Sequence, residues 1–226
     1  MKRMAFLFLL MVLLLSACNL PAPATPQAPR PTPAIPDDPG TPSAGLTRQQ
    51  RSYLSSATVR IWGVQLRGSG DPILLYNGSG TIISPDGLIL TNCHVANPGA
   101  MGYDEQVDSL LIDITERDDR PPVSTYYAEV LASDPTLDLA VIRITHTLDG
   151  SPVRPADLNL PYVPLGDSDQ VGLGDPLYIF GFPGIGGDSI TYTSGSISGF
   201  DSEEPVGNRA WIKTDATIAG GNSGGL

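Results

Sequence analysis

Short apolar runs, several of them alternating with polar residues, recur along residues 59–213 and are separated by glycine, proline and aspartate. Alternation with a period of two is typical of strands that bury one face. The runs predict strands at 59–66, 73–76, 81–83, 88–90, 109–114, 123–131, 139–145, 177–180, 189–197 and 210–213. In the first run the phase changes between Ile61 and Trp62, which predicts a β-bulge there. The residues Ser84-Pro85-Asp86-Gly87 predict a tight turn.

One short helix is predicted before the strands, near residues 48–54. Thr47 followed three residues later by Gln50 fits a capping box, a signal for the start of a helix. The sequence contains no long amphipathic helix and no alternation of strands with helices. Many short strands at this spacing predict an all-β sandwich or barrel, and the spacing alone leaves one barrel or two as alternatives.

The N-terminal segment has the pattern of an export signal. Lys2 and Arg3 precede an apolar run at 4–15, which is too short to span a bilayer but suits a secretory signal. The small residues after this run lead directly to Cys18, and this arrangement resembles a bacterial lipobox. We therefore expect residues 1–17 to be a lipoprotein-type signal peptide and Cys18 to be lipidated. The alternative is a soluble secreted protein with an incidental cysteine.

A proline-rich segment follows. Nine of the 22 residues from Pro21 to Pro42 are proline. Proline fixes φ and lacks an amide donor, so we expect residues 18–43 to form an extended tether, with plain disorder as the alternative. Residues 44–226 are then expected to form one domain.

Charge and composition exclude several classes of function. The chain has 13 Lys and Arg against 24 Asp and Glu, a net charge of −11, which disfavours binding to nucleic acid. Two cysteines exclude a disulfide scaffold and a cysteine-based zinc site. No cofactor or metal is expected. A mechanism that needs a histidine has two candidates, His94 and His146.

Three segments carry candidate chemistry. A serine hydroxyl is a weak nucleophile unless an imidazole takes its proton and a carboxylate orients that imidazole. Ser223 is flanked by glycines, which allow a sharp turn with backbone amides free to face an oxyanion. His94 comes after a predicted strand and Asp138 comes at the start of another, so rigid elements could present both side chains.

Five motifs occur in one order from about residue 56 to the end. They are Gly-Ser-Gly-Thr-Ile-Ile at 78–83, Thr-Asn-Cys-His-Val at 91–95, Asp-Leu-Ala-Val-Ile-Arg-Ile at 138–144, Pro-Leu-Gly-Asp-Ser at 164–168, and Thr-Asp-Ala at 214–216 with Gly-Asn-Ser-Gly-Gly at 221–225. With these motifs the chain resembles the trypsin-like serine proteases, specifically the bacterial HtrA/DegP-like branch.

The resemblance implies an all-β, chymotrypsin-like double β-barrel. It also implies peptide-bond hydrolysis through an acyl-enzyme, without a cofactor. His94 would be the general base, Asp138 the orienting carboxylate and Ser223 the nucleophile. The loop of Gly221, Asn222 and Ser223 would form the oxyanion hole, through the amides of Gly221 and Ser223. Polypeptides would be the substrates, and trimers are common in the family.

The chain departs from the family pattern at several places. Family members continue with further strands of the second barrel, so we expect that barrel to be truncated at its C-terminal end. Ala219-Gly220 stands where the family usually has Asn-Pro, and Leu226 where it usually has Pro. Thr217, six residues before the serine, carries no charge, which disfavours cleavage after Lys or Arg.

Other residues of these motifs have simpler interpretations. Asp134 competes with Asp138 and is interpreted as a turn or cap residue. Cys93 is expected to be a small buried side chain, and His146 a surface residue. Asp215 is expected to accept hydrogen bonds from loop amides.

The sequence favours a serine endopeptidase of the bacterial cell envelope, extracytoplasmic and lipid-anchored to the membrane, that cuts exported, unfolded or damaged proteins. The alternative is a non-catalytic chaperone-like or peptide-binding module on a protease scaffold. A surface adhesin has no positive feature beyond the anchor.

Overall fold

A computed structural model describes residues 45–68 and 71–226 of the chain. The predicted signal peptide at 1–17, the lipidation site Cys18 and the tether at 18–43 lie outside the described residues. None of the helices in the described ranges combines the length and the apolar character that a membrane span requires.

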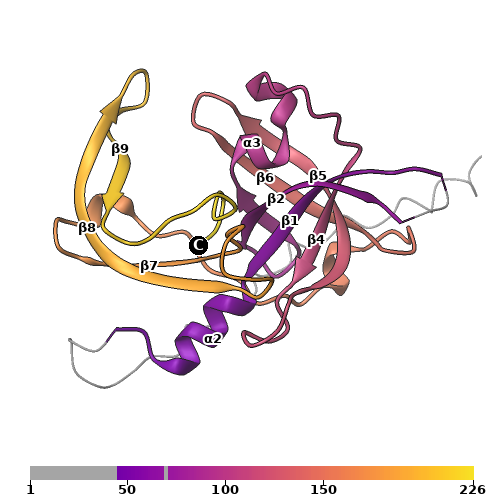
Figure 1. The fold of residues 1–226 in the computed structure, drawn as a ribbon, viewed down its shortest axis with the longest axis horizontal. Coiled ribbons are helices and arrows are strands. Elements are labelled where there is room, and N and C mark those ends of the chain that lie inside the picture. Colours follow the sequence, from indigo (N-terminus) through magenta and orange to yellow (C-terminus); the bar gives the residue numbers. More distant parts are fainter. Residues whose placement is uncertain (1–44, 69–70) are drawn as a thin grey trace, which may run out of the picture. The chain divides into compact units, whose positions relative to one another are not determined.

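The first part of the described chain is a closed barrel of six antiparallel strands in the order β1-β2-β3-β6-β5-β4 (Figure 1). The strands are β1 (Thr58–Gln65), β2 (Ile73–Ile82), β3 (Leu88–Thr91), β4 (Ser109–Ile114), β5 (Val123–Asp134) and β6 (Leu139–Thr147). The all-β class is thus confirmed, together with the first barrel. Closure removes exposed strand edges, and it brings β3 and β6, which are far apart in the sequence, side by side.

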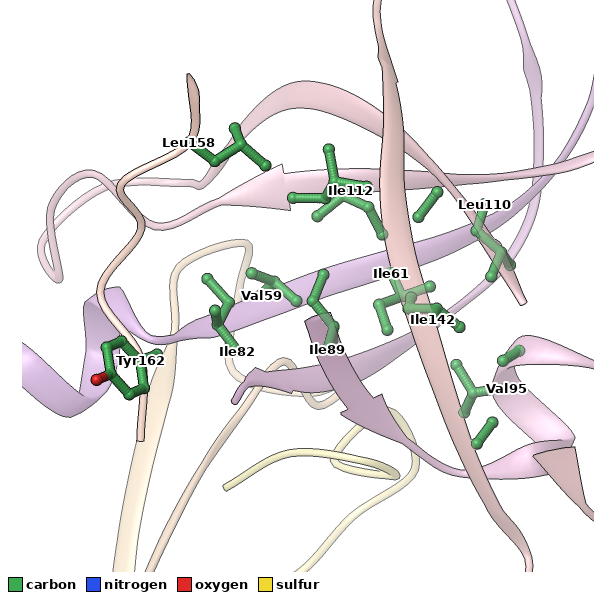
Figure 2. Close-up of a cluster of buried hydrophobic side chains, with 14 residues drawn as sticks. Val59, Ile61, Ile82, Ile89, Val95, Leu110, Ile112, Ile142, Leu158 and Tyr162 are labelled. Carbon is green, nitrogen blue, oxygen red and sulfur yellow. The ribbon is translucent and has the colours of Figure 1, made fainter. Parts of the chain in front are cut away.

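The core of this barrel consists mainly of branched aliphatic side chains, with three alanines and Tyr162 among them (Figure 2). On β6, Ile142 and Ile144 are buried in the core cluster, while Arg143 between them is not part of it. Several members have no exposed surface, namely Val59, Ile61, Ile82, Ile89, Ile112 and Ile142. Burial of each such side chain stabilises the fold by about 1.5–3 kcal/mol, so the barrel is a rigid support for the loops at its ends.

Two predictions about the first strands were wrong in detail. The register between β1 and β2 shifts between Gly63 and Val64, not at Ile61 and Trp62. The reason is that Trp62 stays on the outer face, where its Nε1 donates to a carboxylate oxygen of Asp113 at 2.9 Å. The predicted strands at 73–76 and 81–83 are one strand, β2, because the small residues between them continue the pairing with β1.

Short helices flank the barrel. The helix α2 (Arg48–Ser56) begins with the predicted capping box, since the Thr47 hydroxyl accepts from the Gln50 amide and the Gln50 side chain accepts from the Thr47 amide. The four-residue helix α3 (Cys93–Ala96) was not predicted, because it is too short to show a helical period. Single turns of 3₁₀ helix lie at η1 (Pro98–Met101), η2 (Pro155–Asp157) and η3 (Ser168–Gln170).

After the barrel, the described residues form a three-stranded antiparallel sheet in the order β7-β8-β9. These strands are β7 (Pro176–Gly181), β8 (Thr191–Glu203) and β9 (Gly207–Thr214), each longer than predicted. Two backbone hydrogen bonds, of 2.9 and 3.1 Å, join Phe180 of β7 to Leu226. They hold the 219–226 segment beside this sheet.

Candidate active site

His94 and Asp138 are brought together by the register of the first barrel. β3 ends at Thr91 and β6 begins at Leu139, and Thr91 is paired with Ala140. His94 therefore lies on α3, just after β3, and Asp138 directly before β6. The His94 Nδ1 lies 2.7 Å from the Asp138 Oδ2, and the His94 amide donates to Oδ1 at 2.9 Å. One carboxylate thus holds both the ring and the backbone of the histidine.

The backbone of Asp138 is also fixed in place. Its φ of 49° lies in the left-handed region, which costs a non-glycine residue about 1–2 kcal/mol. Two donors offset this strain at the Asp138 carbonyl, the Cys93 amide at 3.1 Å and the Asn92 Nδ2 at 2.7 Å. The segment 92–94 therefore binds Asp138 through both its backbone and its side chain. Sequence reasoning found Asn92 in a motif but gave it no role.

The competing carboxylate, Asp134, does not approach the histidine in this way. Its Oδ1 accepts hydrogen bonds from the amides of Thr136 at 2.8 Å and Leu137 at 3.1 Å. This is the turn role that the sequence predicted. Asp215 likewise accepts from a backbone amide, that of Ser196, at 2.6 Å.

Ser223 lies in a tight loop that depends on glycine. Gly221 has a φ of 99°, and a Cβ at this position would lie 2.4 Å from the Phe182 carbonyl oxygen. The Gly220 carbonyl accepts from the Gly184 amide at 2.8 Å. Any larger residue at 221 would therefore force this loop away from the 182–184 segment.

The amide groups of the loop divide into two sets. The Asn222 amide donates to the Ala219 carbonyl at 3.1 Å, and the Gly225 amide donates to the Asn222 carbonyl at 2.9 Å. In the described part of the chain, no acceptor takes a hydrogen bond from the amide of Gly221 or of Ser223. Of the three residues predicted for the oxyanion hole, Asn222 thus uses its own amide inside the turn.

His94 and Ser223 border one cavity of about 310 Å³, which is also lined by Gly221, Tyr76 and Glu105. The side chains of His94 and Asp138 are 34% and 23% exposed, so a ligand in the cavity can reach the imidazole. Within the described residues, no hydrogen bond joins the Ser223 hydroxyl to the His94 ring. Such bonds are often formed only when substrate is bound.

Tyr76 is a lining residue that sequence reasoning missed. Its hydroxyl donates to the Val95 carbonyl on α3 at 2.9 Å. Burial, followed by the negative charge of Glu105, raises the pKa of Tyr76 to about 12. The phenol is therefore neutral at physiological pH and acts as a hydrogen-bond donor beside the helix that carries His94. No motif contained Tyr76, so the sequence offered no signal for this contact.

The side chains of Cys93 and His146 do not line the cavity at His94. Cys93 is a free thiol and fully buried, as predicted, and burial raises the pKa of the Cys93 thiol. His146 is half-buried on β6 and lines a separate cavity of about 640 Å³. No group of three or more His, Cys, Asp or Glu side chains able to hold a metal ion occurs among the residues that the structure describes.

Comparison with known proteins identifies one matching family and several relatives. Residues 78–226 match the family described as "Trypsin-like peptidase domain". The chain is 36% identical over 154 residues to a Rickettsia prowazekii protein named "Probable periplasmic serine endoprotease DegP-like", an alignment that covers 66% of this chain and 25% of that protein. It is 35% identical over 162 residues to the mitochondrial serine protease HTRA2 of Bos taurus, covering 70% of this chain and 30% of the relative.

A human relative, serine protease HTRA4, is 30% identical over 206 residues, covering 83% of this chain and 37% of the relative. The chain thus spans between about a quarter and two fifths of the length of these curated relatives.

Proposed function

Because the chain belongs to the trypsin-like peptidase family, in its HtrA-like branch, we propose that it is a serine endopeptidase with Ser223 as nucleophile, His94 as general base and Asp138 as the orienting carboxylate. The observation that carries this proposal is the double contact of Asp138 with His94, at 2.7 Å to Nδ1 and 2.9 Å to the amide. A carboxylate on Nδ1 keeps the proton there, so the Nε2 lone pair can accept a proton.

The reaction follows from these roles. The Ser223 oxygen attacks the carbonyl carbon of the peptide bond while His94 Nε2 takes the hydroxyl proton. The negative charge that develops on the carbonyl oxygen is stabilised by donors aimed at it, and the amides of Gly221 and Ser223 have no other acceptor in the described chain. The imidazolium then gives its proton to the leaving amine, and water hydrolyses the resulting acyl-enzyme by the same route.

A fluorophosphonate probe tests the nucleophile. The unchanged chain is expected to become covalently labelled, and Ser223→Ala is expected to abolish labelling, while the control Ser202→Ala, an exposed serine on β8, keeps it. Labelling that survives Ser223→Ala would contradict the assignment. A chain that binds unfolded polypeptide but never labels would instead match the non-catalytic chaperone-like alternative.

The substrates are exported proteins in an unfolded or damaged state. Cleavage requires an extended backbone to lie across His94 and Ser223, and folded proteins keep most of their backbone groups in internal hydrogen bonds. The test compares the reduced, alkylated form of one disulfide-bonded test protein with its native form. Faster cleavage of the unfolded form is expected, and equal rates would contradict the preference.

The chain acts outside the cytoplasm, held to the membrane by a lipid on Cys18 and a tether at 18–43, after removal of 1–17. The apolar run, the position of the cysteine and the name of the periplasmic relative support this location. Cell fractionation tests it, since Cys18→Ser should move the protein from the membrane fraction to the soluble fraction. A variant that stays with the membrane would rule out the lipid anchor.

A further inference from the structure

Ser79 has no part in the reaction scheme, yet its contacts lead to residues 221–223, the loop that carries the proposed nucleophile (the nucleophile loop). It lies within β2 and has no exposed surface. Its hydroxyl donates to the Gly221 carbonyl at 2.7 Å and accepts from the Phe182 amide at 2.9 Å. Its own amide donates to the Ser223 carbonyl at 2.8 Å, and its carbonyl accepts from the Thr91 hydroxyl at 2.7 Å. Every polar group of this buried residue therefore has a partner.

The direction of the Ser79 hydroxyl proton follows from these contacts. A serine hydroxyl carries one proton and accepts through its lone pairs. Since the Phe182 amide supplies a proton to the Ser79 oxygen, the hydroxyl proton must serve the Gly221 carbonyl. The side chain thus joins two segments that are far apart in the sequence, the 182–184 segment and the nucleophile loop.

Ser79 holds the loop at two points. The carbonyls of Gly221 and Ser223 belong to the peptide groups on either side of the one that bears the Ser223 amide. Because one residue of β2 binds both, the 221–223 segment cannot slide along the strand without losing a hydrogen bond. The orientation of the middle peptide is then held by the bond from the Gly225 amide to the Asn222 carbonyl.

We propose that Ser79 is a positioning residue for the oxyanion donors and for the Ser223 nucleophile, an inference that rests on the proposed function of Ser223. β2 pairs with β3, and His94 follows β3 on α3. The contacts of Ser79 therefore fix the nucleophile loop to β2, the neighbour of the strand that leads into α3 and His94. Ser79 itself touches neither substrate nor the reacting atoms.

Loss of the hydroxyl would act on the reaction more than on binding. The Gly221 carbonyl and the Phe182 amide would lose their shared partner in a buried position, so the 221–223 segment would shift to find others. The amides of this segment serve the charge that develops in the transition state, and small errors in their position slow the chemical step. Substrate affinity depends mainly on other contacts, so the turnover rate should fall while KM stays nearly constant.

The experiment uses the full chain, its Ser79→Ala variant and Thr115→Val as a matched control. Thr115 is also buried, and its hydroxyl also donates to a backbone carbonyl, that of Thr58, at 2.8 Å, but it does not line the cavity at His94. We expect the midpoint of urea unfolding to decrease in both variants. The rate of fluorophosphonate labelling should fall about 10- to 100-fold in Ser79→Ala only, less than the 10²–10³-fold lost with a direct oxyanion donor.

Further measurements distinguish a Ser79 that positions the loop for the reaction from a Ser79 that only stabilises the fold. In Ser79→Ala, kcat for a peptide substrate should fall by the same factor as the labelling rate, with KM changed less than about three-fold. The nearly isosteric Ser79→Cys, whose thiol is a weaker donor, should be intermediate and serves as the test variant if Ser79→Ala does not fold. A folded Ser79 variant that labels as fast as Thr115→Val would overturn the proposal. Failure of the unchanged chain to label would instead overturn the proposed function, and the role of Ser79 with it.

Discussion

The pKa of Tyr76 reports on the electrostatics of the cavity that His94 and Ser223 border. Burial and then the charge of Glu105 raise its pKa to about 12. We predict that Glu105→Gln lowers the pKa of Tyr76 while leaving it above the ordinary value, because burial remains. The measurement is an ultraviolet titration of phenolate absorbance, taken as the difference between each chain and the same chain with Tyr76→Phe. Glu129→Gln, an exposed carboxylate outside this cavity, is the control and should leave the titration unchanged.

The same pKa has a consequence for stability with a definite sign. An unfolded tyrosine ionises near pH 10, whereas the folded chain keeps Tyr76 protonated up to about pH 12. The unfolded state therefore binds fewer protons in this window, and the free energy of unfolding falls as the pH rises through it. A Tyr76→Phe chain should lose part of this decline. An identical decline in both chains would show that Tyr76 titrates normally.

The sequence indicated some residues of the candidate site and not others. His94, Asp138 and Ser223 could be proposed as site residues because each stands in a contiguous motif, and Asp134 was separated from Asp138 by its turn pattern. The contacts that hold them could not be found in this way. Asn92 meets the Asp138 carbonyl, and Ser79 meets Gly221, across 46 and 142 positions of the chain. Only the folded barrel brings these pairs together.

The capping box of α2 is a feature of one element whose energetic role can be measured. The Thr47 hydroxyl accepts from the Gln50 amide at 3.2 Å, and α2 packs through buried Leu54 and through the Tyr53 hydroxyl, which donates to the Tyr162 carbonyl at 2.8 Å. We predict that Thr47→Ala lowers the free energy of unfolding by about 1 kcal/mol, since the helix loses the hydrogen bond between the Gln50 amide and the Thr47 hydroxyl. Urea denaturation measures this change.

Ser52→Ala is the matched control for this helix. Ser52 lies in α2 and is exposed, so its replacement by a better helix former should leave stability unchanged or raise it slightly. If Thr47→Ala were as stable as Ser52→Ala, the cap would be without energetic effect.

Elements were predicted well where a local pattern is sufficient. The capping box marked α2, and alternating runs marked nine strands of the described chain, with two of the runs merging into β2. The predicted position of the β1 bulge was wrong, because the pattern counted the apolar Trp62 as an inward-facing position, whereas its indole contacts Asp113 of β4 on the outer face. The helix α3 is only four residues long, which is too short to show a helical period in the sequence.

At the scale of the whole described chain, the candidate site forms where the two sheets meet the 219–226 segment. The barrel supplies His94 and Asp138 from its β3 and β6 ends, and β2 holds the nucleophile loop through Ser79. The second sheet holds the same segment through the paired hydrogen bonds of Phe180 and Leu226. Through its resemblance to the trypsin-like proteases, the sequence predicted the barrel and the three candidate residues. The contacts that join these parts are made mostly by backbone groups, with the Ser79 hydroxyl among them, and the motifs did not indicate them.

These two parts of the chain should differ in local stability. β1 pairs with strands on both sides, and Val59, Ile61 and Val64 in it have no exposed surface. β9 pairs only with β8 among the described strands, and its Trp211 and Ile212 are 52% and 42% exposed.

Amide exchange requires local opening, and the free energy of opening rises with the apolar surface that must be exposed. We therefore predict that β9 amides exchange with deuterium at least ten-fold faster than β1 amides, as measured by mass spectrometry of peptic fragments. Because Phe180 of β7 holds Leu226 and the Gly184 amide donates to the Gly220 carbonyl, exchange in β7 should also report how firmly the nucleophile loop is held. Equal protection in β9 and β1 would mean that the described chain opens as one cooperative unit, and the second sheet would then be as rigid a support for Ser223 as the barrel is for His94.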